Sequence, residues 1–128
     1  MQNKNLPLSP HLQVYRWYFT MFLSILHRAT GFALSAGALL LCGWLLATAS
    51  GEYDFHRFHE CLSHPIGQLM LIGWLYSFVF HFLNGLRHLV WDTGYWLEKK
   101  SAAASGYAVF FASMIVTLAL WLFAKGFA

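Results

Sequence analysis

The hydrophobic positions along this chain fall into three long runs that contain no Asp, Glu, Lys or Arg. The runs are Ala29–Ser50, Pro65–Leu86 and Ser101–Ala124, and within the second run His81 stands out as an ionisable side chain. Each run is close to the roughly 20 residues that an α-helix needs to cross a hydrocarbon layer about 30 Å thick. The pattern therefore predicts transmembrane helices over about 22–50, 64–92 and 102–126.

The segments that flank these runs are polar and short. Residues 51–64 and 93–100 are short enough to keep successive helices antiparallel neighbours. Ser9 and Pro10 form the pattern of a helix start, and the aromatic residues that follow prefer the headgroup level. We therefore expect an all-α integral membrane protein, with an interfacial helix over about 9–20 and a three-transmembrane-helix antiparallel bundle, as one domain over 1–128.

The composition supports a membrane location, and the basic residues predict an orientation. With 59% hydrophobic and 10% charged residues, the chain has too little polar surface to cover a soluble globule of its length. Lys and Arg in short loops stay preferentially on the cytoplasmic side of a membrane. Only Arg57 and Lys125 lie on the other side of the predicted spans from the remaining basic residues. Those remaining residues predict a cytoplasmic or matrix-facing N-terminus: Lys4, Arg16, Arg28, Arg87, Lys99 and Lys100. Because no Arg- and Ser-rich transit segment is visible, a bacterial inner membrane is favoured over a mitochondrial one.

The net charge bears on nucleic-acid binding, and the two cysteines bear on a disulfide or a metal site. A net charge of +3 without a Lys/Arg cluster or a soluble basic domain does not indicate nucleic-acid binding. Cys42 is centred in the first span and Cys61 lies in the loop opposite the cytoplasm. Their separation and spacing predict neither a disulfide nor a metal site.

Ionisable side chains near the end of the second span indicate a cofactor site. His81, Gly85, His88 and Asp92 follow at i, i+4, i+7 and i+11, so they lie along one stripe of the helix. A neutral imidazole is a common axial ligand of haem iron, and a glycine one turn away leaves room for a flat macrocycle. His88 is about 10 Å further along, which suits a haem propionate. Alternatively, His81 is a packed histidine between helices and Gly85 a helix-packing contact.

A second group of polar side chains lies where the first span begins. Ser24, His27 and Arg28, at i, i+3 and i+4, share a helix face. An arginine in apolar surroundings needs an anionic or accepting partner, and a haem propionate or a quinone carbonyl would serve. Ser24 can donate to a quinone oxygen, and His27 can bind a carboxylate or relay a proton. The alternative is that Arg28 extends to the lipid headgroups as a topology anchor.

Three strings along the chain resemble one family, the cytochrome b membrane-anchor subunit of succinate dehydrogenase. In order, they are Ser9-Pro10-His11-Leu12-Gln13-Val14-Tyr15, then Ser24-Ile25-Leu26-His27-Arg28-Ala29-Thr30-Gly31, then His81 through Asn84-Gly85-Leu86-Arg87-His88 to Trp91-Asp92. The resemblance implies a three-helix subunit that pairs with a second hydrophobic anchor subunit. Together the two would hold the flavoprotein and iron–sulfur subunits on the membrane.

The resemblance also implies a reaction and the location of its cofactors. The assembled enzyme would oxidise succinate to fumarate and pass electrons through iron–sulfur clusters to ubiquinone. FAD and the clusters would belong to partner subunits, and this chain would perform no dicarboxylate chemistry itself. Haem b would be shared between the two anchor subunits.

The resemblance implies a role for each residue that matches one of the family's motifs. His81 matches the axial haem ligand, and the second iron ligand would be a histidine of the other anchor subunit. Ser24 and Arg28 match the serine and arginine of the quinone site. His27, Arg28 and His88 match positions near the haem propionates.

The chain departs from many relatives of this family at two places, and other functions use similar helices. Leu6 precedes Pro7 where an arginine is common, and Phe80 precedes His81 where the family often has a pair of histidines. A fumarate reductase anchor, a b-type anchor for another dehydrogenase, and a scaffold without haem or quinone are the rival functions. The presence of haem and quinone in the isolated complex separates the scaffold from the others.

Overall fold

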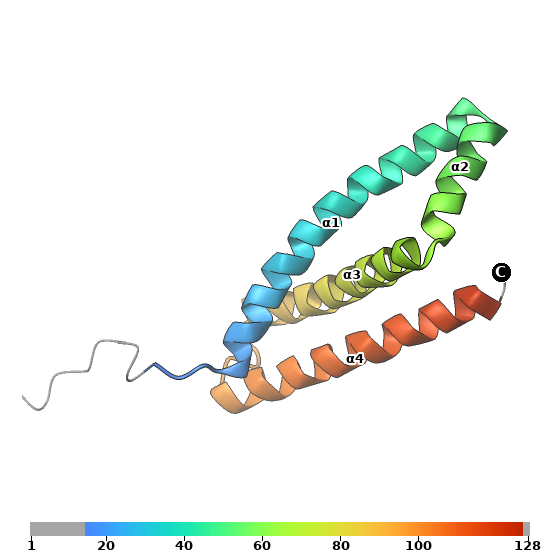
Figure 1. Ribbon diagram of the computed structural model, residues 1–128. Helices are drawn as coiled ribbons and strands as arrows, with labels where there is room; N and C mark the ends of the chain where they lie inside the picture. The colour runs from blue at the N-terminus through green and yellow to red at the C-terminus, as the bar shows by residue number, and fades with distance from the viewer. Residues whose placement is uncertain (1–14, 127–128) are drawn as a thin grey trace, which may run out of the picture.

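The structure, a computed structural model, describes residues 15–126 of the 128-residue chain. Four helices follow one another: α1 (Phe19–Ser50), α2 (Glu52–Ser63), α3 (Pro65–Asp92) and α4 (Lys99–Gly126). All regular elements in this range are helical. The predicted all-α fold class is therefore confirmed (Figure 1).

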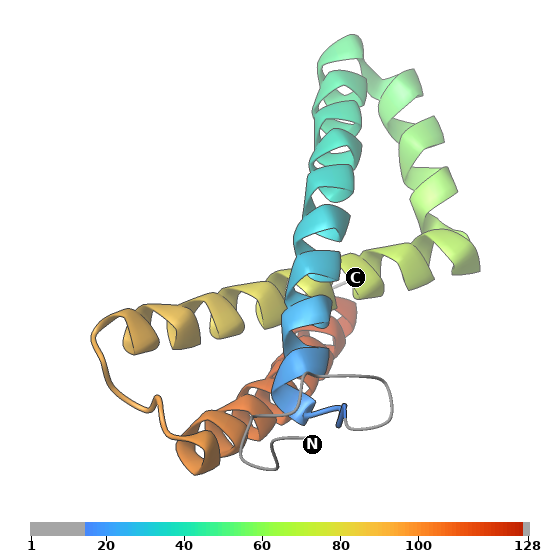
Figure 2. The same cartoon turned by 90° about the vertical axis from the view of Figure 1, so that its left-hand side faces the viewer.

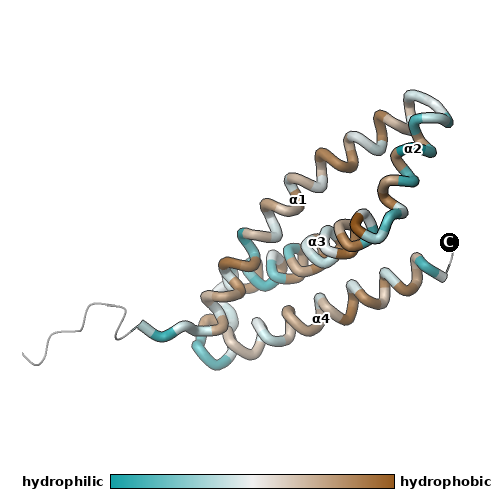
Figure 3. The backbone as a smooth tube through the Cα atoms, in the orientation of Figure 1, coloured by the Kyte–Doolittle hydropathy of each residue, from teal (hydrophilic) through white to brown (hydrophobic). Residues whose placement is uncertain are grey.

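Three of the helices are long and apolar enough to cross a membrane. These are α1, α3 and α4, with 32, 28 and 28 residues. Their bounds agree with the predicted spans, although α1 begins three residues earlier than expected and α4 already at Lys99. Figure 3 shows that most of their length is hydrophobic or intermediate, whereas hydrophilic positions gather in α2. The protein is thus a multi-pass membrane protein.

The predicted polar connector between the first two spans is itself a helix, α2, which the sequence analysis did not anticipate. Glu52 and Asp54 lie in its first turn, where negative charge is favoured by the helix dipole. Phe58 packs back against α1, because a Cβ built at Gly43 would lie 3.3 Å from its ring. α3 then begins with Pro65 at its first position, and His64 Nδ1 accepts a hydrogen bond from the backbone N–H of Ile66. The 14-residue connector is therefore ordered rather than a simple loop.

The N-terminal segment differs from the expected interfacial helix where it can be followed. Residues 9–14 of that expected helix lie outside the described residues, and residues 15–18 are not helical. Tyr18 has an extended backbone, with φ −96° and ψ 148°, so α1 starts only after it. The aromatic side chains here are exposed, and rings at the headgroup level need no helix to hold them there.

α1 and α4 lie close together near their first turns and diverge toward the α2 end of α1 (Figure 1), whereas α3 crosses α1 at an angle (Figure 2). Phe19 of α1 stacks on Tyr107 of α4 with ring centroids 4.0 Å apart. Further along α1, the buried Gly37 packs directly under the indole of Trp74 from α3. The fully buried apolar core among the described residues is small: Leu23, Val79 and Phe80. Many large apolar side chains face outward, as expected when lipid or partner subunits cover them.

The two cysteines lie in α1 and α2. Cys42 and Cys61 are free thiols, and both are exposed. Among the described residues, neither cysteine belongs to a cluster of three or more His, Cys, Asp or Glu side chains.

Candidate functional site

His81 lies where α3 meets α1, and its ring rests on the backbone of α1. Its Nδ1 is 3.1 Å from the carbonyl oxygen of His27 and 3.3 Å from Thr30 Oγ1. A Cβ built at Gly31 would lie 3.0 Å from His81 Cε1, so the ring approaches α1 at a position without a side chain. Thr30 and Gly31 therefore position this histidine, and the sequence analysis had not assigned them that role.

These contacts define which nitrogen of His81 carries the proton. The Thr30 hydroxyl donates to the His27 carbonyl at 2.9 Å, so both oxygens near Nδ1 present lone pairs. Nδ1 must therefore be the N–H that donates to them, and Nε2 of the neutral ring is left with a lone pair. Nε2 makes no hydrogen bond to any described residue. An imidazole that donates Nδ1–H to a carbonyl and presents Nε2 is the common arrangement of a metal-ligating histidine.

His27 lies directly beside His81. The two imidazole rings stack with centroids 3.9 Å apart and an angle of 12° between their planes. The ring of His88 approaches His27 with a centroid distance of 5.3 Å. His27 Nδ1 is buried and lacks a hydrogen-bond partner in the part of the chain that the structure describes. Buried polar atoms are normally paired, so this nitrogen is available to a group outside the chain. His27, His81 and His88 together form a histidine cluster.

His88 is oriented by a chain of hydrogen bonds that starts at Arg87. Arg87 Nη1 donates to Asn84 Oδ1 at 3.2 Å, and this donation fixes the orientation of the Asn84 amide. The amide nitrogen of Asn84 therefore faces His88 Nε2, 3.3 Å away, and donates to it. In the neutral ring the proton of His88 is then on Nδ1, which is free to donate to an anion.

Arg87 itself is buried, with 5% of its surface exposed, and serves the packing of α3 against α4. Its Nε donates to Ser105 Oγ at 3.0 Å, and Nη2 donates to the Ala102 carbonyl at 2.6 Å. The guanidinium carbon lies 3.9 Å from the centroid of the Trp91 ring, a cation–π contact. Gly106 of α4 lies beside this arrangement and gives room to Leu23 of α1, because a Cβ there would lie 2.5 Å from Leu23 Cδ1. The charge that the sequence analysis used only for topology is thus a structural link between two helices.

Ser24 and Arg28 occupy the exposed side of α1 near the histidine cluster. Arg28 Nε donates to the backbone carbonyl of Ser24 at 3.4 Å. No other hydrogen bond of the guanidinium, and none of the Ser24 hydroxyl, is formed with the described residues. Both side chains therefore keep free donors on an apolar helix, available to a group outside this chain.

The stripe predicted along α3 is only partly a single site. His81 and His88 belong to the histidine cluster, and a Cβ built at Gly85 would have no atom of the described chain within 4 Å. The predicted approach of a flat macrocycle to Gly85 requires such open space. Asp92, in contrast, is exposed and makes no hydrogen bond or ion pair with the described residues. Helix periodicity placed it on the stripe, but it is the last residue of α3.

Phe80 stands at the position where many relatives of the family have the first of two adjacent histidines. Its side chain is fully buried between the helices and stacks on Tyr76 with a centroid distance of 6.0 Å. Position 80 thus faces the interior between the helices, whereas His81 faces α1. Of the two positions, only position 81 carries a ring nitrogen, Nε2, that makes no hydrogen bond with the described residues.

Comparison with known proteins places this geometry in a family. The family model described as the succinate dehydrogenase/fumarate reductase transmembrane subunit matches residues 2–120. The chain belongs to this family. It is a membrane anchor of complex II, of the cytochrome b subunit type of succinate dehydrogenase.

Bacterial and mitochondrial proteins are both among the relatives of this complex II anchor. The succinate dehydrogenase cytochrome b556 subunit of Rickettsia prowazekii is 37% identical over 116 residues, which cover 91% of this chain and 90% of the relative. The cytochrome b556 subunit of Paracoccus denitrificans is 39% identical, with 89% and 88% covered. The mitochondrial cytochrome b560 subunit of Sus scrofa is 36% identical, with 92% and 73% covered.

Proposed function

We propose that this anchor binds haem b together with a second anchor subunit, and that it forms part of the ubiquinone-reduction site. The observation that carries the proposal is the orientation of His81, whose Nδ1–H is bound by α1 while Nε2 stays available. Haem supplies a one-electron redox centre when bound. The family membership and the naming of the relatives as cytochrome b subunits support this assignment.

The residues around His81 fit the group. The open space at Gly85 accommodates a macrocycle edge beside the helix backbone. His27 and His88 supply an unpaired buried nitrogen and a free Nδ1–H, as the carboxylates of a haem would need. The second iron ligand would be a histidine of the other anchor subunit, as the family resemblance implies.

Ser24 and Arg28 are proposed to bind a carbonyl of the ubiquinone headgroup. Their free hydroxyl and guanidinium donors lie on the exposed side of α1, within one turn of each other. Donors fixed in a water-poor site stabilise the negative charge that develops on a carbonyl oxygen during reduction. Arg28 is also close enough in sequence to His27 to contact a haem propionate, so it is the residue that connects the two groups.

The membrane orientation and partners follow from the same proposal. Arg16, Arg28, Lys99 and Lys100 gather at the end where α1 and α4 begin, whereas α2 at the other end carries Glu52, Asp54, Glu60 and Arg57. By the positive-inside rule, the former end is cytoplasmic in a bacterial inner membrane, or matrix-facing in a mitochondrion. This end then contacts the iron–sulfur subunit, which with the flavoprotein subunit completes the enzyme.

A spectrum of the intact complex tests the proposal against its rivals. The complex is purified in mild detergent, its subunits are separated on a gel, and a reduced-minus-oxidised spectrum is recorded. We expect a b-type haem signal and succinate-dependent reduction of added ubiquinone. A colourless complex that does not reduce ubiquinone would favour a scaffold, and preferential fumarate reduction with a low-potential quinone would favour a fumarate reductase anchor.

A further inference from the structure

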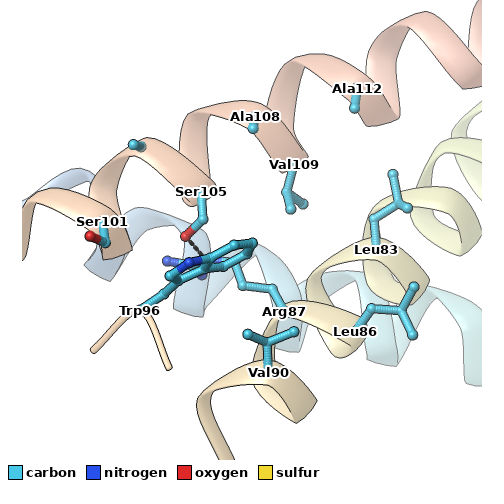
Figure 4. Close-up of a pocket in the computed structure, with 11 residues that line it drawn as sticks. Leu83, Leu86, Arg87, Val90, Trp96, Ser101, Ser105, Ala108, Val109 and Ala112 are labelled. Carbon is cyan, nitrogen blue, oxygen red and sulfur yellow. Dashed lines mark hydrogen bonds between the residues drawn. The ribbon is translucent and has the colours of Figure 1, made fainter. Parts of the chain in front are cut away.

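A cavity lies between α3 and α4, on the side of α3 that faces away from His81. Its volume is about 670 Å³. Figure 4 shows its two walls, with Leu83 and Leu86 on α3 and Ala108 and Ala112 on α4. At about 100° per residue, Leu83 and Leu86 lie roughly 160° and 140° around the helix from His81. This α3–α4 groove is therefore separate from the histidine cluster.

The groove is apolar along its length and polar at one end. Ser101, Ser105 and Arg87 lie at that end, next to Trp96 (Figure 4). Arg87 and Ser105 are already bonded to each other and to Ala102. The apolar part thus has no polar group in need of a partner, which suits a hydrocarbon chain.

The length of the groove indicates what kind of hydrocarbon fits. Its α4 wall runs from Ser101 to Ala112, about 16 Å at 1.5 Å per residue. This is roughly half of a hydrocarbon layer about 30 Å thick. A transmembrane helix of another subunit would need contacts along the whole span, whereas an acyl chain of one leaflet ends near the bilayer centre.

The polar end carries positive charge. Lys100 directly precedes Ser101 in the first turn of α4, is exposed, and lies one turn before Ala104 on the groove side of the helix. Lys99, in contrast, lines a different pocket, beside Phe19 of α1. The exposed Trp96 lines the same end of the groove, at the level where indole rings favour the membrane interface. An ammonium group beside an interfacial indole complements an anionic phosphate group.

We propose that the α3–α4 groove binds one anionic phospholipid, with an acyl chain between the two helices and its phosphate at Lys100. The assignment does not depend on haem or quinone binding. A second anchor subunit that supplies a haem ligand docks on the His81 side of α3 and leaves this groove accessible to lipid. The lipid would fill the space between α3 and α4 beyond the Arg87 link.

The test counts lipids on the purified whole complex by native mass spectrometry. The complex is delipidated in detergent and titrated with phosphatidylglycerol or phosphatidylcholine. Ala108→Phe places a ring in the groove, and Ala119→Phe is its control, because Ala119 is exposed on the same helix two turns beyond Ala112. We expect Ala108→Phe to retain one phosphatidylglycerol fewer per copy of this chain, and Ala119→Phe to match the unsubstituted complex.

A surface variant tests the headgroup without altering the helix packing. Lys100→Gln should weaken phosphatidylglycerol binding roughly fivefold and leave phosphatidylcholine binding unchanged. Lys99→Gln removes the same charge at a residue that lines a different pocket, so it is the control and should leave both unchanged. Equal binding of the two lipids by the unsubstituted complex would overturn the anionic headgroup. An unchanged lipid count in Ala108→Phe would overturn the groove. Specific loss of the second anchor subunit, or of ubiquinone, from Ala108→Phe would replace the lipid by a helix interface or a quinone tail.

Discussion

Arg28 and Arg87 are both arginines in apolar membrane spans, yet their surroundings differ in kind. Arg87 is 5% exposed and donates to Asn84, Ser105 and Ala102 while it covers the Trp91 ring. Arg28 is exposed and makes one long hydrogen bond, to the backbone of its own helix. A charge in a membrane needs partners, and one arginine finds them within the chain while the other does not. The comparison separates a structural charge from one that is available to a ligand.

The largest expected effect is the loss of the internal partners of Arg87. Arg87→Ala removes charge-assisted hydrogen bonds and leaves the Asn84 amide and the Ala102 carbonyl without their donor, at a cost of about 3 kcal/mol or more in stability. We expect the yield and the thermal stability of the assembled complex to fall, as measured by co-purification of the subunits on heating. Arg28→Ala is the matched control and should assemble normally. Normal assembly of Arg87→Ala would contradict the structural role.

Arg28→Ala should instead act on electron transfer to quinone. Loss of a preorganised donor to a quinone carbonyl costs about 2–3 kcal/mol, or roughly 30- to 160-fold in rate. Succinate oxidation by an artificial dye acceptor should remain, because that reaction does not use this chain. Ser24→Ala should show the same pattern more weakly. If dye and quinone activities decline together, Arg28 serves assembly and the contrast with Arg87 is lost.

Two glycines of α3 give a test of the open space at the histidine cluster. Neither Gly85 nor Gly73 would meet any atom of the described chain within 4 Å if it gained a Cβ. Gly85→Leu should lower the haem content per complex several-fold, since the macrocycle occupies that space, whereas Gly73→Leu should leave it unchanged. Haem is measured by its pyridine haemochrome spectrum. Equal haem contents would mean that the space beside Gly85 holds lipid or nothing.

The smallest effect is expected at Thr30, which acts through His81. Thr30→Val removes one of the two oxygens that accept the His81 Nδ1–H, at a cost of about 0.5–1.5 kcal/mol. A weaker hydrogen bond makes the imidazole a poorer electron donor, so the haem midpoint potential should rise by roughly 20–60 mV. A redox titration of the complex measures it. A lowered potential would refute the proposed donor direction at Nδ1.

The spans were predictable from sequence because membrane hydrocarbon imposes a length and an apolar composition on each helix. The extra helix α2 was not, since its segment is polar and of loop length, and only Glu52 and Asp54 in its first turn indicate a helix start. The periodicity of α3 correctly placed His81 and His88 on one face, where both rings approach His27, but it could not show that Asp92 is exposed at the end of the helix.

The roles of Thr30, Gly31 and Arg87 required the structure because they depend on contacts between helices. Thr30 is 51 residues from His81, and no pattern within α1 indicates that its hydroxyl meets that ring. Arg87 has its partners on α4, 15 and 18 residues away. The sequence shows that a charge in a span needs a partner, whereas only the arrangement of the helices shows whether the partner belongs to the same chain.

The most direct measurement of the central claim is the reduced-minus-oxidised spectrum of the His81→Ala complex beside that of His64→Ala. His64 lies at the opposite end of α3, where it caps the helix, so it serves as the control. We predict that His81→Ala loses or strongly shifts the b-type signal while all subunits still co-purify, and that His64→Ala keeps it. An unaltered b-type spectrum in His81→Ala would show that this histidine does not bind the haem iron.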